Sequence, residues 1–239
     1  VLKKARTKEV RFFRDLTLHS KIAITATLIL IFVGAAFIFA FEYNNPQTMG
    51  DYTLLQKIEV SLFQSVTTRT AGFATVPQEN LTNASAIVCL LLMFIGGSPV
   101  GTAGGIKTVT FAVIIVAAIA SIRNKEDTEV FGRQLTKQAV SKAVAVTCMS
   151  FIIMFTSTVL LSAVTDANAL DIVYETVSAT ATVGLTRNLT ASLGSVGKLI
   201  IIITMYFGRV GPISLAVAFK RSKDNQNIVR NPIEEISVG

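Results

Sequence analysis

The chain has 239 residues, of which 51% are hydrophobic and 15% are charged, and its mean hydropathy is +0.58. This composition is too apolar for an ordinary soluble domain. One histidine and two cysteines provide no nucleophile–base set, disulfide framework or zinc site, so an enzyme is not expected. The net charge of +7 would suggest nucleic acid in a soluble protein. In this chain the apolar runs are long enough to cross a bilayer, so membrane topology explains the positive charge better. No nucleic-acid partner is therefore expected.

Positive charge gathers in three segments outside the apolar runs, residues 1–21, 123–142 and 220–230. Because cytoplasmic loops of membrane proteins carry an excess of Lys and Arg, we expect both ends and the central linker in the cytoplasm. The alternative is that these segments bind anionic lipid head groups. Residues 1–19 predict a cytoplasmic or interfacial lead-in helix. The chain is expected to cross the cell membrane several times.

Residues 20–122 form the first of two similar units. A first span is expected over residues 21–41, and the helical spacing of apolar residues over 52–67 predicts a shorter helix that enters and leaves the membrane on one side. A second span covers about residues 84–122. Five glycines and a proline within residues 96–105 interrupt it, because these residue types cannot hold a regular helix.

Residues 142–219 form the second unit, after a hydrophilic cytoplasmic linker at 123–141. Its expected elements repeat those of the first unit in the same order: a span at 142–164, a short re-entrant helix at 169–179 and a span at about 196–219. Arg209 lies near the middle of this last predicted span. Residues 220–239 are polar and predict a cytoplasmic tail.

Each unit carries the same kind of loop after its short helix: Thr70-Ala71-Gly72-Phe73 and Thr182-Val183-Gly184-Leu185. Two matched loops between membrane helices are typical of an ion-channel pore, in which backbone carbonyls replace the water shell of the ion. Glycine permits backbone angles that let successive carbonyls face one axis. We therefore expect an ion-selectivity filter with K⁺ at the carbonyls of Ala71, Gly72, Val183 and Gly184. The alternative is a pair of extracellular turns in an unrelated helical protein.

The glycine-rich break in the second span predicts a gate below this filter. Irregular backbone at membrane depth must line a watery cavity or be packed in protein. An arginine within a span needs a partner, and Arg209 is the expected anchor of the loop. The alternatives are a static break that eases helix packing and an Arg209 that reaches the membrane interface. The expected gate consists of Gly96, Gly97, Ser98, Pro99, Gly101, Thr102, Ala103, Gly104, Gly105 and Arg209.

These motifs resemble the Trk/Ktr/HKT superfamily of potassium-uptake proteins, and most closely its bacterial KtrB-type membrane subunit. The resemblance rests on both loops, on Phe63-Gln64-Ser65-Val66, on residues 96–108 and on Gly208-Arg209-Val210-Gly211-Pro212. It implies an all-α membrane protein in which four helix–pore loop–helix repeats of potassium-channel type form a pseudo-tetrameric pore. This chain shows two parallel repeats, which look like the third and fourth, and is expected to form half of that pore.

The resemblance also implies the partners and ions. An N-terminal half with two further pore repeats, a homodimer of the full membrane subunit and a cytosolic nucleotide-binding ring of KtrA type are expected, with membrane lipid around them. K⁺ is the transported ion, and no cofactor is expected on this chain. Sodium activation is a trait of that family, and the resemblance offers Na⁺ as an activating ion without assigning it a residue here.

The expected function is the ion-translocating membrane subunit of a potassium-uptake system. The main rival is a secondary cation transporter with a midplane site formed by broken helices, which predicts inverted repeats. An intramembrane enzyme would need a carboxylate pair, a metal cluster or a nucleophile–base set within the spans. A structural subunit without a transport role would leave the duplicated loops unexplained.

Overall fold

Threonine caps start three helices of the first unit. The computed structural model describes residues 16–98, 103–125 and 127–211. The side chains of Thr17, Thr53 and Thr82 each accept a hydrogen bond from the backbone amide three residues later, which satisfies an otherwise unpaired donor. The helices of this unit are α2 (Leu18–Glu42), α3 (Leu54–Thr67), the 3₁₀ turn η1 (Gln78–Asn80), α4 (Asn83–Phe94) and α5 (Thr108–Ile122).

The second unit follows the same plan with similar caps. Thr136 starts its long helix and Asn168 starts its short one, each through a side-chain oxygen. The last long helix begins after Gly194 without a side-chain cap. The helices of this unit are α6 (Lys137–Ser162), α7 (Ala169–Thr180), α8 (Leu189–Ser192) and α9 (Ser195–Val210).

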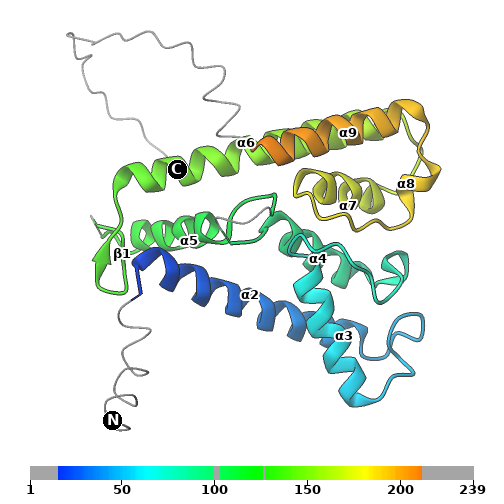
Figure 1. The fold of residues 1–239 in the computed structure, drawn as a ribbon, viewed down its shortest axis with the longest axis horizontal. Coiled ribbons are helices and arrows are strands. Elements are labelled where there is room, and N and C mark those ends of the chain that lie inside the picture. The colour runs from blue at the N-terminus through cyan, green and yellow to red at the C-terminus, as the bar shows by residue number, and fades with distance from the viewer. Residues whose placement is uncertain (1–15, 99–102, 126, 212–239) are drawn as a thin grey trace, which may run out of the picture.

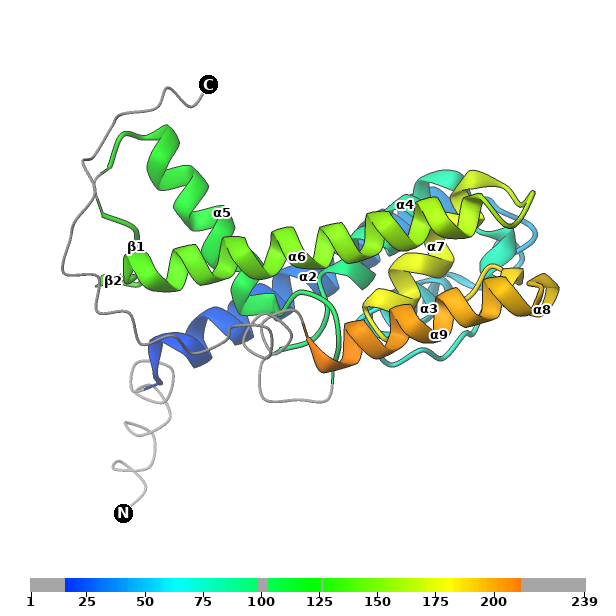
Figure 2. The same cartoon turned by 90° about the horizontal axis from the view of Figure 1, so that it is seen from above.

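The two units run in parallel. Figure 1 shows α2 and α6 starting at the same end of the molecule, and Figure 2 shows the same arrangement from above. Within each unit the first long helix packs on the short helix, α2 on α3 and α6 on α7. Helices α4 and α7 pack together and join the units, and one apolar core runs through this contact, with Met93, Cys89 and Tyr174 fully buried. This parallel order differs from the inverted repeats that the secondary-transporter alternative predicts.

Most predicted elements lie where the sequence places them. Helices α2 and α6 are long and apolar enough to cross a membrane, with mean hydropathies of 2.7 and 2.2. The second span is split as predicted, into the shorter apolar helices α4 and α5. Of the fourth, the structure describes α9, which ends at Val210 before Gly211, whose φ of 82° does not continue a helix. The lead-in residues 1–15, residues 99–102 of the expected gate and residues 212–239 lie outside the described part.

The linker contains a short hairpin that the sequence analysis did not predict. Two short strands, β1 (Glu129–Val130) and β2 (Arg133–Gln134), pair antiparallel within it. Phe131 and Gly132 join them with φ of 52° and 69°, the left-handed pair that a two-residue hairpin turn requires. Helix α6 then begins at Lys137, inside the predicted linker, because Thr136 supplies its cap.

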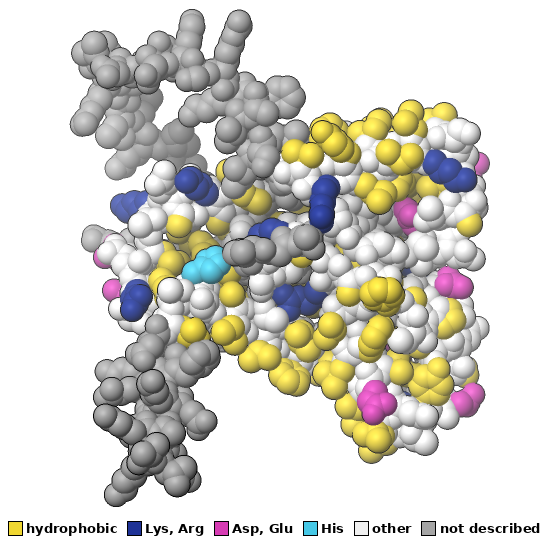
Figure 3. All heavy atoms as spheres, viewed as in Figure 1, with side chains coloured by type: hydrophobic (Ala, Val, Ile, Leu, Met, Phe, Trp, Pro, Cys, Tyr) yellow, Lys and Arg dark blue, Asp and Glu magenta, His cyan; other side chains and the backbone are white. Residues whose placement is uncertain are grey.

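The outer surface is apolar over wide areas. Large exposed side chains include Phe32 of α2, Phe155 of α6 and Ile202 of α9, all more than half exposed. Figure 3 shows hydrophobic atoms spread over this face, with most acidic side chains toward the end that carries α3, α7 and α8. Such continuous apolar surface on long helices is what contact with lipid or another membrane segment requires.

Candidate functional site

The two matched loops have the same backbone. Thr70 and Gly72 in the first loop have φ of 68° and 78°, and Thr182 and Gly184 in the second have φ of 54° and 95°. Positive φ at alternate residues departs from both helix and strand geometry, and glycine adopts it without steric cost. Threonine at φ above zero is uncommon, and both loops place one there.

Near the end of each short helix, one hydroxyl-bearing residue accepts hydrogen bonds from two backbone amides of the loop that follows. Thr67 accepts the amide of Gly72 with its carbonyl at 3.1 Å and that of Phe73 with its hydroxyl at 2.8 Å. Ser178 accepts the amides of Val183 and Gly184 in the same two ways, at 2.9 and 3.1 Å. The loop amides are thus turned toward the protein.

The loop carbonyls are left open. Among hydrogen bonds between described residues, the carbonyls of Ala71, Gly72, Val183 and Gly184 accept none. The two loops touch, since a Cβ added to Gly72 would lie 2.1 Å from the carbonyl oxygen of Val183. The structure therefore brings the two predicted loops into contact, and cation binding at these four carbonyls would cost no hydrogen bond between described residues.

The described arms of the glycine-rich segment lie against these loops. A Cβ on Gly104 would lie 2.3 Å from the hydroxyl of Thr182, and one on Gly97 would lie 4.0 Å from the hydroxyl of Thr70. The arms also bond to each other: the amide of Ile106 donates to the carbonyl of Phe94 at 3.1 Å, beside a bridge between Ile95 and Ile106. The segment is therefore a loop with a paired base, packed under both matched loops.

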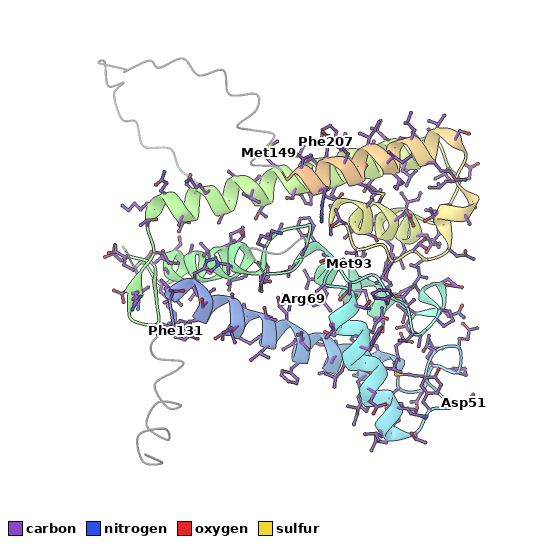
Figure 4. All side chains as sticks on the ribbon, in the orientation of Figure 1. Asp51, Arg69, Met93, Phe131, Met149 and Phe207 are labelled. Atoms are coloured by element: carbon purple, nitrogen blue, oxygen red, sulfur yellow. The ribbon has the colours of Figure 1, made fainter. Side chains whose placement is uncertain are left out.

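A different arginine from the predicted one reaches this base. The guanidinium of Arg69 donates to the hydroxyl of Thr108 at 2.7 Å and to the carbonyl of Gly96 at 3.4 Å, and on its other side to the carbonyl of Thr27 at 3.2 Å. Figure 4 shows it in the middle of the molecule. The sequence motifs assigned no role to Arg69. A charged residue beside a membrane loop needs polar partners, and this requirement could have pointed to Arg69.

Arg209 lies in the last turn of α9 and is exposed. Its charge is close enough to Lys107 for the two cations to interact. Lys107 follows the glycine-rich segment and donates to the carbonyl of Ala103. The predicted role of Arg209 as an anchor of the loop remains a prediction.

A buried polar network joins the outer ends of the two units. The side-chain oxygen of Gln78 accepts from the amide of Gln64 at 2.6 Å and from the hydroxyl of Tyr174 at 3.0 Å, so it links α3 to α7. Arg187, which follows the second loop, donates to the carbonyl of Gln78 at 2.9 Å and pairs with Asp171 at 2.7 Å. This network fixes the spacing of the two short helices that carry the matched loops.

Replacing Gln78 with leucine is expected to lower the stability of the protein by about 2–4 kcal/mol, because it leaves the Gln64 amide and the Tyr174 hydroxyl buried without their acceptor. Thermal unfolding in detergent measures the change. Gln47→Leu is the control, since Gln47 is exposed and the same chemical change should have little effect there. An equal melting temperature for Gln78→Leu and the control would contradict a role for the network.

Comparison with known proteins places the chain in a family. The family model for TrkH, a cation transport protein, matches residues 4–230. The Ktr system potassium uptake protein B of Bacillus subtilis is 40% identical over 229 residues, which are 96% of this chain and 51% of that protein. Its namesake in Vibrio alginolyticus is 36% identical over 95% of this chain and 50% of its own length. The chain thus spans about half the length of these relatives.

The fold agrees with that placement. The crystal structure of the potassium transporter TrkH from Vibrio parahaemolyticus matches with a TM-score of 0.68 at 16% identity, over 85% of this chain and 44% of that one. The description of the family is that of a transport protein rather than an enzyme, and the predicted resemblance to the Trk and Ktr proteins is confirmed. The match over most of the sequence shows that this chain belongs to the TrkH family of cation transport proteins.

Proposed function

We propose that the chain forms two of the four filter loops of a potassium-uptake protein in the cell membrane. The observation that carries this proposal is the repeated left-handed pair in loops whose four carbonyls accept no hydrogen bond from described residues. Carbonyl oxygens in such an array can replace the hydration shell of K⁺. The relatives named for potassium uptake support K⁺ as the ion.

The filter comprises residues 70–73 and 182–185, with K⁺ at the carbonyls of Ala71, Gly72, Val183 and Gly184. Helices α3 and α7 end directly before these loops, at Thr67 and Thr180. The C-terminal end of a helix carries partial negative charge, so both short helices favour a cation at the loops. The backbone at these two helix ends supplies the negative field, so no charged side chain is needed in the ion path.

The remaining filter loops come from an N-terminal half with two further repeats. Both loops have open positions that further loops could cover: Phe73 is 70% exposed and a Cβ on Gly184 would meet nothing within 4 Å. The apolar surfaces of the long helices suit lipid and a second copy of the membrane subunit. The cytoplasmic linker, with the lead-in and tail outside the described residues, would dock a cytosolic nucleotide-binding ring, and Na⁺ would act as an activator of the whole assembly.

The glycine-rich segment acts as the gate of this pore. Its described arms pack against Thr70 and Thr182, which supports a path in which an ion leaving the filter would pass them. Glycine lets the segment lie directly on the loops, and its paired base holds both ends. Arg209, next to Lys107, would hold the far end of the gate from α9.

Gly184→Ser tests the filter. The added side chain restricts the backbone angles that residue 184 can adopt, and its left-handed conformation becomes unfavourable. The ratio of K⁺ to Na⁺ uptake by the complete transporter is therefore expected to fall toward equality. Gly132→Ser is the matched control, because Gly132 also has positive φ and open space around it but lies in the linker hairpin. Uptake of both ions in cells that depend on this transporter for K⁺ gives the ratio.

An unchanged ratio in Gly184→Ser, at normal abundance in the membrane, would remove Gly184 from the filter and with it the proposed function of the second loop. A lowered ratio in Gly132→Ser would show that strain anywhere in the chain disturbs selectivity.

A further inference from the structure

Arg69 is a cation held by neutral groups. Its three acceptors are the Thr27 carbonyl in α2, the Gly96 carbonyl and the Thr108 hydroxyl. Its Nε is buried and, among described residues, has no hydrogen-bond partner. Arg69 is half-buried, and withdrawing a charge from water without an opposite charge is costly; charged groups within membrane segments are functional more often than structural. The stability of the fold does not explain an arginine at this place.

The position of Arg69 connects three parts of the site. It precedes Thr70, the first left-handed residue of the first loop, by one residue. Its Nη2 reaches both arms at the base of the glycine-rich segment, since Gly96 opens the segment and Thr108 follows it. The Thr108 hydroxyl itself donates to the Gly96 carbonyl at 3.2 Å. A shift of either arm therefore moves an acceptor of the residue next to the filter.

A second contact ties the segment to α2 at the same level. The hydroxyls of Thr27 and Ser98 are 3.1 Å apart, and the carbonyl of Thr27 is the Nη1 acceptor of Arg69. Helix α2 thus provides a fixed point to which the segment and Arg69 are both attached. Because the acceptors of Arg69 are neutral, breaking one of its hydrogen bonds and forming another costs less free energy than breaking a salt bridge.

We propose that Arg69 is a positioning residue that couples the glycine-rich segment to the first filter loop, so that ion selectivity depends on the arrangement of the segment. This inference rests on the proposed function. The planar fork of arginine bridges the segment base and α2 at once, which the point charge of lysine cannot do. Thr108 takes part in selectivity through Arg69, although it belongs to α5 and lies outside the filter.

The test uses the complete transporter in liposomes and measures the ratio of K⁺ to Na⁺ uptake together with total flux. Thr108→Val removes the acceptor hydroxyl and keeps the shape of the side chain. It is expected to lower the ratio by about fivefold or more, the lower end of couplings between distinct sites. Thr108→Ser keeps the hydroxyl and is expected to keep the ratio. Thr110→Val, on the same helix, is the control, because no hydrogen bond of its side chain occurs among the described residues.

Arg69→Lys is expected to lower the ratio as Thr108→Val does, and the double variant should be no worse than the poorer single one, because both changes break one contact. If Thr108→Val changes the flux or the melting temperature but not the ratio of K⁺ to Na⁺ uptake, the proposed coupling is wrong. Arg69 would then have a structural role only. If Arg69→Lys does not fold, the comparison of Thr108→Val with Thr108→Ser still decides the matter.

The two proposals can fail separately. A lowered ratio in Gly184→Ser with an unchanged ratio in Thr108→Val leaves the filter in place and removes only the coupling. Unchanged ratios in both variants remove the filter as well.

Discussion

Gly72→Ala is expected to reduce K⁺ uptake by the complete transporter by about tenfold or more, because a non-glycine residue in a disfavoured backbone region alone costs of the order of 1–3 kcal/mol. Gly72 has φ of 78°, and its added Cβ would lie 2.1 Å from the carbonyl oxygen of Val183 and 3.2 Å from its carbonyl carbon. Both are backbone atoms, which cannot rotate away as a side chain does. The two loops would have to separate, and the separation moves a carbonyl that we propose coordinates the ion.

Initial rates of K⁺ uptake, corrected for the amount of protein in the membrane, measure the effect of Gly72→Ala. Gly194→Ala is the control: Gly194 has a backbone that any residue adopts, with φ of −67°, and nothing lies within 4 Å of its added Cβ. It should transport at the normal rate. Normal uptake by Gly72→Ala would mean that the contact between the loops does not belong to the conducting state.

Local signals in the sequence predict the helices and loops of this chain closely. The short helices were predicted at 52–67 and 169–179, and they run over Leu54–Thr67 and Ala169–Thr180. Caps, apolar periodicity and loop glycines are all read within a few residues of the element they define. The matched backbone of the loops likewise follows from residue types, since glycine at Gly72 and Gly184 allows the left-handed angles.

Such local signals could not predict the contacts between segments that are distant in the sequence. Arg69 bonds to groups 27, 39 and 42 residues away along the chain, and no local pattern selects it over Arg209. Lys57 shows the same limit. No local pattern in the sequence marks this lysine as buried, but it is buried and donates to the carbonyl of Tyr43 at 2.6 Å. The hairpin at Phe131 was missed because phenylalanine is a rare choice for a left-handed turn residue.

Shortening the glycine-rich segment is expected to raise K⁺ flux if the segment is the gate. Its base is held by bonds outside the part removed, from Ile106 to Phe94 and from Thr108 to Gly97, so deleting residues between Ser98 and Ala103 leaves α4 and α5 joined. A segment that serves only to break the span would behave in the opposite way. Its loss would displace the helices around the filter and lower the flux.

Gly104→Ala tests the same gate without a deletion. Its added Cβ would lie 2.3 Å from the Thr182 hydroxyl and 2.5 Å from the Ala181 carbonyl oxygen, so alanine is compatible only with a segment displaced from the second loop. A penalty of about 1.4 kcal/mol on the seated state shifts the open-to-closed ratio about tenfold, and the flux through liposomes should rise accordingly. The two changes should not add, because each unseats the same segment. Lower flux from both variants, with melting temperatures equal to that of the unmodified protein, would show that the segment supports the pore instead of closing it.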